Sequence, residues 1–194
     1  GANSLSADTL GSRSVALGFN ALAVQNFTSA TDAYNVAVGH NAGVSMSTGT
    51  NNTLIGGIAG GAITTGSANT AVGTAALTSN TTANDNVAVG VSALETNTTG
   101  ASNVAINNNA LLRNTTGSSN IAIGKESLSF NTTASNNTAV GHQSLFANTE
   151  GNNNTAVGFG AGSSITTGVE NTTLGSGAGG ITTGTQNVAV GYLP

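Results

Sequence analysis

The side chains that could carry out acid–base or nucleophilic chemistry are few in this chain and scattered along it. Among 194 residues there are seven acidic residues, three basic residues, two histidines and no cysteine. General acid–base and nucleophilic catalysis require such groups to converge on one reacting atom. The acidic residues instead occur singly, at Asp8, Asp32, Asp85, Glu95, Glu126, Glu150 and Glu170. The sequence therefore predicts a protein that is not an enzyme, with no catalytic residues and no cofactor.

The two histidines, His40 and His142, are the best candidates for metal ligands. They occupy equivalent positions of the repeat described below but stand six repeats apart, which is roughly 29 Å at a strand spacing of ~4.8 Å. Protein ligands bind a metal ion at about 2 Å, so the two histidines of one chain cannot share an ion. We interpret both as surface residues that follow a glycine turn, and the sequence predicts no metal site.

The composition excludes several classes of partner. Only 5% of the residues are charged, 4% are aromatic, and the formal net charge is −4. An average domain has about 25% charged residues, and a nucleic-acid-binding protein needs a basic face to neutralise phosphates. No apolar run approaches the ~18 residues of a membrane-spanning helix. The sequence thus predicts no nucleic-acid partner and no membrane insertion.

A repeat of 17 residues organises almost the whole chain. Each copy begins approximately N-T/V-A-V/I-G-x-x-A-L/G and ends in a turn of the form T-T-G followed by two residues. We number the 17 positions as columns, with the opening asparagine in column 1. These asparagines are Asn35, Asn52, Asn69, Asn86, Asn103, Asn120, Asn137, Asn154, Asn171 and, after a step of 16, Asn187. A related copy, SVALG, begins at Ser14. We therefore predict a repeat domain of about 11 coils over residues 14–192, preceded by a short N-terminal segment, residues 1–13.

Each repeat is predicted to form short strands and turns rather than helices. Gly, Asn and Thr recur too often for a helix, whereas short alternating runs of Val, Ile and Thr indicate strands and T-T-G indicates a turn. The predicted fold class is all-β, a parallel β-solenoid with 17-residue coils stacked at ~4.8 Å. About ten coils would form a rod roughly 50 Å long. The column 1 asparagines should then hydrogen-bond from coil to coil as a structural ladder.

The strand columns alternate between small and β-branched residues. Column 3 is almost always Ala, which indicates a narrow interior, while columns 2 and 4 carry mostly Val, Ile or Thr. Two interpretations of this second set are open. The set packs against other copies of the chain around an axis, or column 4 fills a wider monomeric solenoid. Because so slim a coil makes a poor monomeric core, we favour packing between chains.

Three further columns carry structural predictions. Column 5 is Gly in every copy except the one with Asn107, and Asn tolerates positive φ, so the exception favours a left-handed turn over close packing. Columns 9 and 12 compensate each other. Leu94 in column 9 accompanies Asn97 in column 12, whereas Gly60 accompanies Ile63. Each coil is therefore predicted to bury one large side chain, delivered from either column.

Column 6 is the most variable row, and it follows the glycine turn, so we expect it to be exposed. Exposed aromatic and ionisable side chains on a rigid scaffold are candidate contact residues. The alternative is tolerated variation at a permissive position. The candidate surface contact row is Phe19, His40, Lys125, His142, Phe159 and Tyr192.

The copy at residues 12–24, SRSVALGFNALAV, resembles the head repeat of YadA-like trimeric autotransporter adhesins. The 17-residue NTAVGxxALxxNTTG repeats resemble longer relatives of that motif in bacterial surface proteins and phage tail-fibre-like proteins. The resemblance covers about residues 11–192. It implies a left-handed β-roll, a homotrimeric rod, and a location outside the cell, on a cell surface or a virion. The chain departs from the adhesin pattern because its coil is longer and neither a heptad stalk nor a membrane-anchoring barrel is present.

Three functions are compatible with these observations. The first is a non-enzymatic structural and adhesive fibre or head, a homotrimer that attaches to a host-cell or matrix surface through many shallow contacts. The second is the subunit of an extracellular filament that polymerises head to tail through open solenoid ends. The third, which we rank lowest, is ice binding through rows of paired threonines such as Thr98 and Thr99. In a turn, those hydroxyls would instead hydrogen-bond to nearby backbone.

Overall fold

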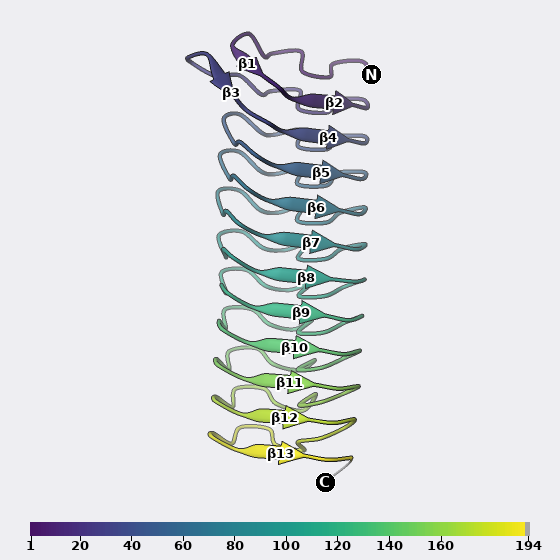
Figure 1. Cartoon of the computed structure of the whole chain (residues 1–194), viewed down its shortest axis with the longest axis vertical. Helices are drawn as coiled ribbons and strands as arrows, with labels where there is room; N and C mark the ends of the chain where they lie inside the picture. Colours follow the sequence, from purple (N-terminus) through teal and green to yellow (C-terminus); the bar gives the residue numbers. More distant parts are fainter. Residues whose placement is uncertain (193–194) are drawn as a thin grey trace.

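The computed structural model describes residues 1–192 of the 194 in the chain, and among them it contains strands and turns but no helix. The chain winds as a parallel β-solenoid in which one three-residue strand of each coil pairs with the same strand of the next (Figure 1). The pairing keeps each column in line, as when Ala88 lies opposite Ala105. In Figure 1 the strands face the viewer and run left to right while the chain descends and returns behind them, so the coil is left-handed. The predicted all-β parallel solenoid is confirmed.

Eleven strands form the main sheet, in chain order from one end of the rod to the other. They are β2 (Val15–Leu17), β4 (Val36–Val38), β5 (Thr53–Ile55), β6 (Thr70–Val72), β7 (Val87–Val89), β8 (Val104–Ile106), β9 (Ile121–Ile123), β10 (Thr138–Val140), β11 (Thr155–Val157), β12 (Thr172–Leu174) and β13 (Val188–Val190).

A two-stranded sheet beside the main one accommodates four extra residues in the coil that opens at Ser14. It consists of β1 (Gly11–Ser12) and β3 (Thr31–Asp32), which pair in parallel at the N-terminal end of the rod (Figure 1). Residues 1–13 follow the geometry of the later coils. For example, Asn3 hydrogen-bonds to Asn20 17 residues further on, and Leu5 donates its backbone N–H to Ala21. The segment before Ser14 therefore supplies the second half of a further coil.

Positive φ angles recur at four columns of a coil and turn the chain back on itself. In the coil that opens at Asn86 they occur at Gly90 (137°), Ser92 (55°), Leu94 (53°) and Ser102 (58°). Column 5 is Gly for two reasons, because its φ is positive and because a Cβ there would collide with the carbonyl of column 5 in the next coil. The positive φ predicted for this turn is confirmed, whereas the preference for a turn over close packing was wrong, since both apply. Asn107 takes this position with φ of 101°.

The interior of the rod is narrow and filled by a few rows of side chains. Columns 3 and 8 contribute mostly Ala to this interior. The large residues of columns 9 and 12, such as Leu94 and Ile63, are fully buried. The compensation between columns 9 and 12 follows from backbone strain. Column 9 has a left-handed φ, which is unfavourable for a Leu such as Leu94. Where column 9 is glycine, as at Gly60, this conformation costs no strain, and Ile63 in column 12 supplies the buried side chain instead.

Column 3 takes part in the same compensation, which the sequence prediction of one large side chain per coil missed. Leu54, in place of the usual Ala, is fully buried between Gly43 and Gly60. A Cβ added to Gly43 would lie 2.8 Å from one methyl carbon of Leu54, and a Cβ added to Gly60 would lie 2.7 Å from the other. The coil that opens at Asn52 therefore buries both Leu54 and Ile63.

Candidate interaction surface

The column 1 asparagines form a continuous internal ladder. Asn103 is fully buried, and its Oδ1 accepts hydrogen bonds from the backbone N (2.9 Å) and Nδ2 (3.2 Å) of Asn120 in the next coil. Its Nδ2 crosses the interior to donate to the Gly117 carbonyl at 2.9 Å. Each such amide thus joins neighbouring coils, and most of them, such as that of Asn103, also tie the start of a coil to its last turn. The ladder is a structural element rather than a binding site, because it is closed to solvent.

A second asparagine ladder runs through column 12 of five consecutive coils, and sequence reasoning treated those residues only as partners of the column 9 leucines. Asn114 donates its Nδ2 to Asn97 Oδ1 at 2.8 Å and to the Gly117 carbonyl at 2.8 Å. The ladder stops where Ile165 replaces Asn. Asn148 Oδ1 consequently has no hydrogen-bond partner among the described residues although it is buried. The run of Asn at a spacing of 17 was the signal that could have identified this ladder.

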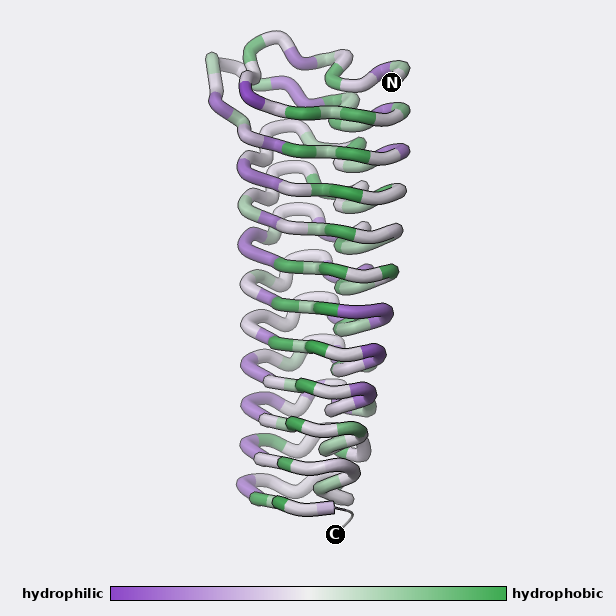
Figure 2. Tube along the Cα trace, turned by 45° about the vertical axis from the view of Figure 1, so that its right-hand side comes forward, coloured by the Kyte–Doolittle hydropathy of each residue, from purple (hydrophilic) through white to green (hydrophobic). Residues whose placement is uncertain are grey.

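The outward face of the sheet is uncharged along the whole rod and contains a continuous aliphatic row. Columns 2 and 4 of all eleven strands carry only Val, Ile, Leu or Thr, and column 4 is aliphatic throughout. Ile106 and Ile123 are 36% and 37% exposed. Figure 2 shows these strands as a hydrophobic stripe along the rod. Column 4 therefore points outward, which contradicts the interpretation of a wider solenoid with column 4 inside.

The candidate contact row of column 6 lies along one edge of this face, where the strands end. Phe19, Phe159 and Tyr192 are 48%, 62% and 76% exposed. The ring centroids of His142 and Phe159 are 5.2 Å apart with an interplanar angle of 10°. Phe19 stacks in the same way on His40, at 5.7 Å. Four of the six candidate residues thus form two stacked pairs, one in each half of the rod.

Lys125 lies between these pairs and is also exposed. Its Nζ is 3.8 Å from Glu126 Oε1. The two histidines belong to different pairs, and the described part of the chain contains no cluster of three or more potential metal-ligating residues.

Arg113, a charge on an otherwise neutral coil, packs on an aromatic side chain. Its guanidinium carbon lies 4.1 Å from the ring centroid of Phe130, a cation–π contact. Phe130 in turn meets Phe146 edge-on at 4.9 Å. Arg113 and Phe130 both lie in column 11 and Phe146 lies in column 10, on the return side of the coil. The spacing of 17 between Arg113 and Phe130 was the signal that could have indicated their contact.

The paired threonines divide into two kinds. The column 13 hydroxyls donate to the backbone carbonyl of the next coil, as Thr98 does to Thr115 at 2.9 Å. This is the backbone role expected for a turn. The column 14 residues, such as Thr99 and Thr116, are exposed. Only the second row therefore presents hydroxyl groups to solvent.

The part of the chain that the structure describes contains no pocket. Residues 1–192 also include no helix long and apolar enough to span a membrane. Comparisons with protein-family models, curated proteins and solved structures gave no match to this chain. The surface features themselves therefore carry the functional argument.

Proposed function

We propose that this chain is a non-enzymatic structural and adhesive module of an extracellular fibre or head, and that it acts as a homotrimer. The observation that carries the proposal is the uncharged outward face of strands β2 and β4–β13. A contiguous apolar patch of that length is unusual on a monomer and is typical of an interface. A second copy of the same chain, laid along the rod, is a partner whose apolar face has matching length.

A rigid rod with exposed side chains along one edge suits attachment to a cell or matrix surface. Many weak contacts on a trimer act together, so the apparent affinity exceeds that of any single contact without a deep pocket. For the same reason we propose a location at a cell or virion surface, in keeping with the resemblance of the chain to surface-displayed β-roll repeats.

Light scattering on the purified chain tests the assembly. We expect a mass three times the 18.6 kDa of one chain, and a monodisperse species of 18.6 kDa would refute the interchain packing. The variant Ile106→Lys/Ile123→Lys places two charges on adjacent strands of the apolar face and should dissociate the assembly. The matched control is Thr116→Lys/Thr133→Lys, which alters exposed column 14 residues of the same two coils and should leave the mass unchanged.

Adhesion is tested separately on immobilised matrix and on cultured cells. Wild-type protein should be retained more strongly than the dissociated double variant, because the variant loses multivalency. Electron micrographs of the same material distinguish the filament alternative, since end-to-end polymers would appear as continuous fibres rather than isolated rods.

A further inference from the structure

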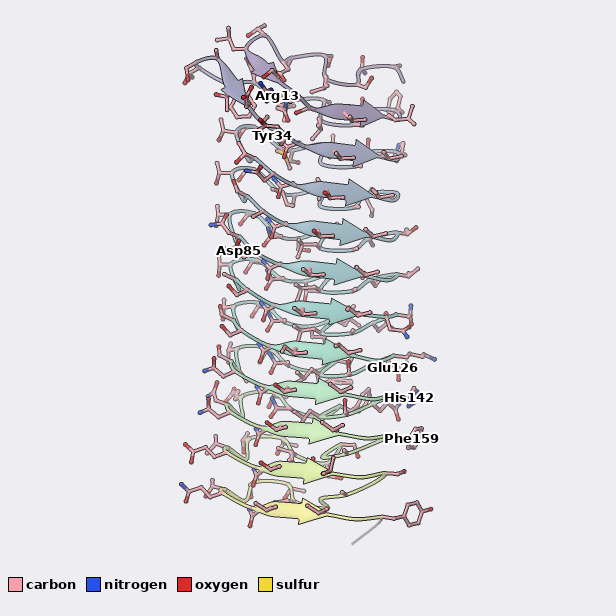
Figure 3. The ribbon with its side chains drawn as sticks, viewed as in Figure 1. Arg13, Tyr34, Asp85, Glu126, His142 and Phe159 are labelled. Atoms are coloured by element: carbon pink, nitrogen blue, oxygen red, sulfur yellow. The ribbon has the colours of Figure 1, made fainter. Side chains whose placement is uncertain are left out.

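Two stacked rings lie beside a hydrogen-bonded polar pair near the C-terminal end of the rod. We call this group the second corner; it consists of Glu126, His142, Gln143 and Phe159. The rings of His142 and Phe159 stack at 5.2 Å, and Gln143 Nε2 donates to Glu126 Oε2 at 2.8 Å. Figure 3 shows Glu126, His142 and Phe159 on the same edge of the rod. His142, which carries one ring, and Gln143, which carries the amide, are adjacent in the chain.

A related arrangement occurs near the N-terminal end. We call it the first corner; it consists of Phe19, Asn20, His40 and Asn41. The rings of Phe19 and His40 stack at 5.7 Å with an interplanar angle of 8°. Asn20 Nδ2 donates to Asn41 Oδ1 at 3.1 Å. At both places an aromatic pair in column 6 therefore lies near a bonded polar pair in column 7. The two pairs come from the same two coils at the first corner, whereas at the second corner the polar pair lies one coil nearer the N-terminus than the ring pair.

Both corners leave ring surface and polar atoms available to a ligand. Phe159 is 62% exposed and is followed in column 6 by the small residue Ser176. His40 is followed by Gly57, around which an added Cβ would meet nothing within 4 Å. Among the described residues, nothing hydrogen-bonds to Gln143 Oε1 or accepts from Asn41 Nδ2.

The chemistry of the corners selects among ligands that stack on aromatic rings. A nucleobase would bring phosphates, but the whole chain has only three Lys and Arg residues, and Lys125 is already paired with Glu126. An apolar peptide side chain would require a pocket, and the described residues form none. A sugar ring presents a C–H face to the aromatic ring and hydroxyl groups to the neighbouring amides. We propose that each corner binds one ring of a neutral polysaccharide.

The spacing of the two corners favours a long polysaccharide over a single sugar. His40 and His142 stand six coils apart, roughly 29 Å at ~4.8 Å per coil. A chain laid along the edge can contact both corners, and the second contact is then intramolecular and strengthens binding. This inference rests on the adhesive function proposed above and names its ligand class.

Titration with neutral glucans, mannans and chitin oligomers, followed by NMR, tests the proposal. Phe19→Ala and Phe159→Ala should each weaken binding of a long polysaccharide by about tenfold, because each removes one of two linked contacts. The double variant should lose detectable binding. Val91→Ala is the matched control, since Val91 is a column 6 residue that is 50% exposed and lies outside both corners. Thermal melts verify that the variants fold.

The proposal is overturned if no neutral polysaccharide binds the wild-type chain at millimolar concentration, or if the double variant binds as well as the control. Retention on cells or matrix by a wild-type chain that binds no polysaccharide would refute this inference alone and leave the adhesive function standing. Equal loss of polysaccharide binding in Val91→Ala would also count against it, because the corners would then have no special role.

Discussion

Replacing Asn103 by Asp tests whether the internal asparagine ladder holds the coils together. The exchange keeps the shape of the side chain but removes the Nδ2 donor. Asn103 is fully buried, and its Nδ2 lies 2.9 Å from the Gly117 carbonyl. An ionised Asp would therefore place a carboxylate oxygen against a carbonyl oxygen with no water available. A protonated Asp could still donate to Gly117, so burial and this acceptor raise the pKa of the new carboxyl above its unfolded value of ~3.9.

The pH dependence of the loss follows from that raised pKa. Below about pH 4 the carboxyl is protonated in both the folded and unfolded states, so the variant should be nearly as stable as the wild type. Above that pH the loss grows by about 1.4 kcal/mol per pH unit until the folded-state pKa is reached. If that pKa is 7 or higher, the loss at pH 7 is about 4 kcal/mol, which corresponds to a decrease in Tm of roughly 8–16 °C for a domain of this size.

Thermal and denaturant melts of the wild type and the variant between about pH 3.5 and 8 measure this difference. The control is Asn136→Asp, which makes the same chemical change at an exposed position and should change stability by less than about 0.5 kcal/mol. A loss for Asn103→Asp that is independent of pH, or no larger than that of the control, would refute the reasoning about the ladder.

Three further predictions concern the coil interior and the glycine turn. Leu94→Gly should destabilise the rod by about 2–5 kcal/mol because it empties a buried site, and adding Asn97→Ile should restore part of that loss; additive losses in melts would contradict the compensation. The pair Leu145→Gly/Asn148→Ile should be less harmful than the pair at Leu94 and Asn97, by about 1–3 kcal/mol. The reason is that Asn148 Oδ1 is already unpaired at the ladder's end, so the exchange moves that end by one coil, whereas the central exchange creates a second unpaired oxygen. Gly124→Asn should cost about 1–3 kcal/mol in denaturant melts, because φ is 131° there and an added Cβ would lie 2.5 Å from the Gly141 oxygen; an unchanged midpoint would show that the turn tolerates Asn freely.

Much of the fold could be predicted because a repeat period also sets the neighbours of each residue. In a solenoid, residue i lies beside residue i + 17, so Asn103 must lie between Asn86 and Asn120. The same rule predicted that the large interior side chain comes from column 9 in some coils, as at Leu94, and from column 12 in others, as at Ile63. It gave no information on contacts between different columns, which explains why the packing of Leu54 in column 3 against Gly43 and Gly60 was missed. The contact of Arg113 with Phe130 lies within column 11, and their spacing of 17 could have indicated it.

The candidate contact row shows the same division. Its exposure followed from its place after the glycine turn, and the exposed rings of Phe19 and Phe159 agree with that expectation. The pairing of the rings with bonded polar residues in column 7 was not anticipated. That pairing depends on which neighbouring coils happen to carry rings and amides together, and on the side-chain conformations that bring them into contact.

The sequence by itself determined the period, the strand columns and the identity of the interior rows, because stacking identical short units leaves few ways to align them. Only the tertiary structure decided which way columns 2 and 4 point. Alternation along a strand separates two faces but does not say which one is enclosed. The direction is settled by the return of the chain through columns 8, 9 and 12, which fills the space behind Ala105 and leaves Val104 and Ile106 facing outward.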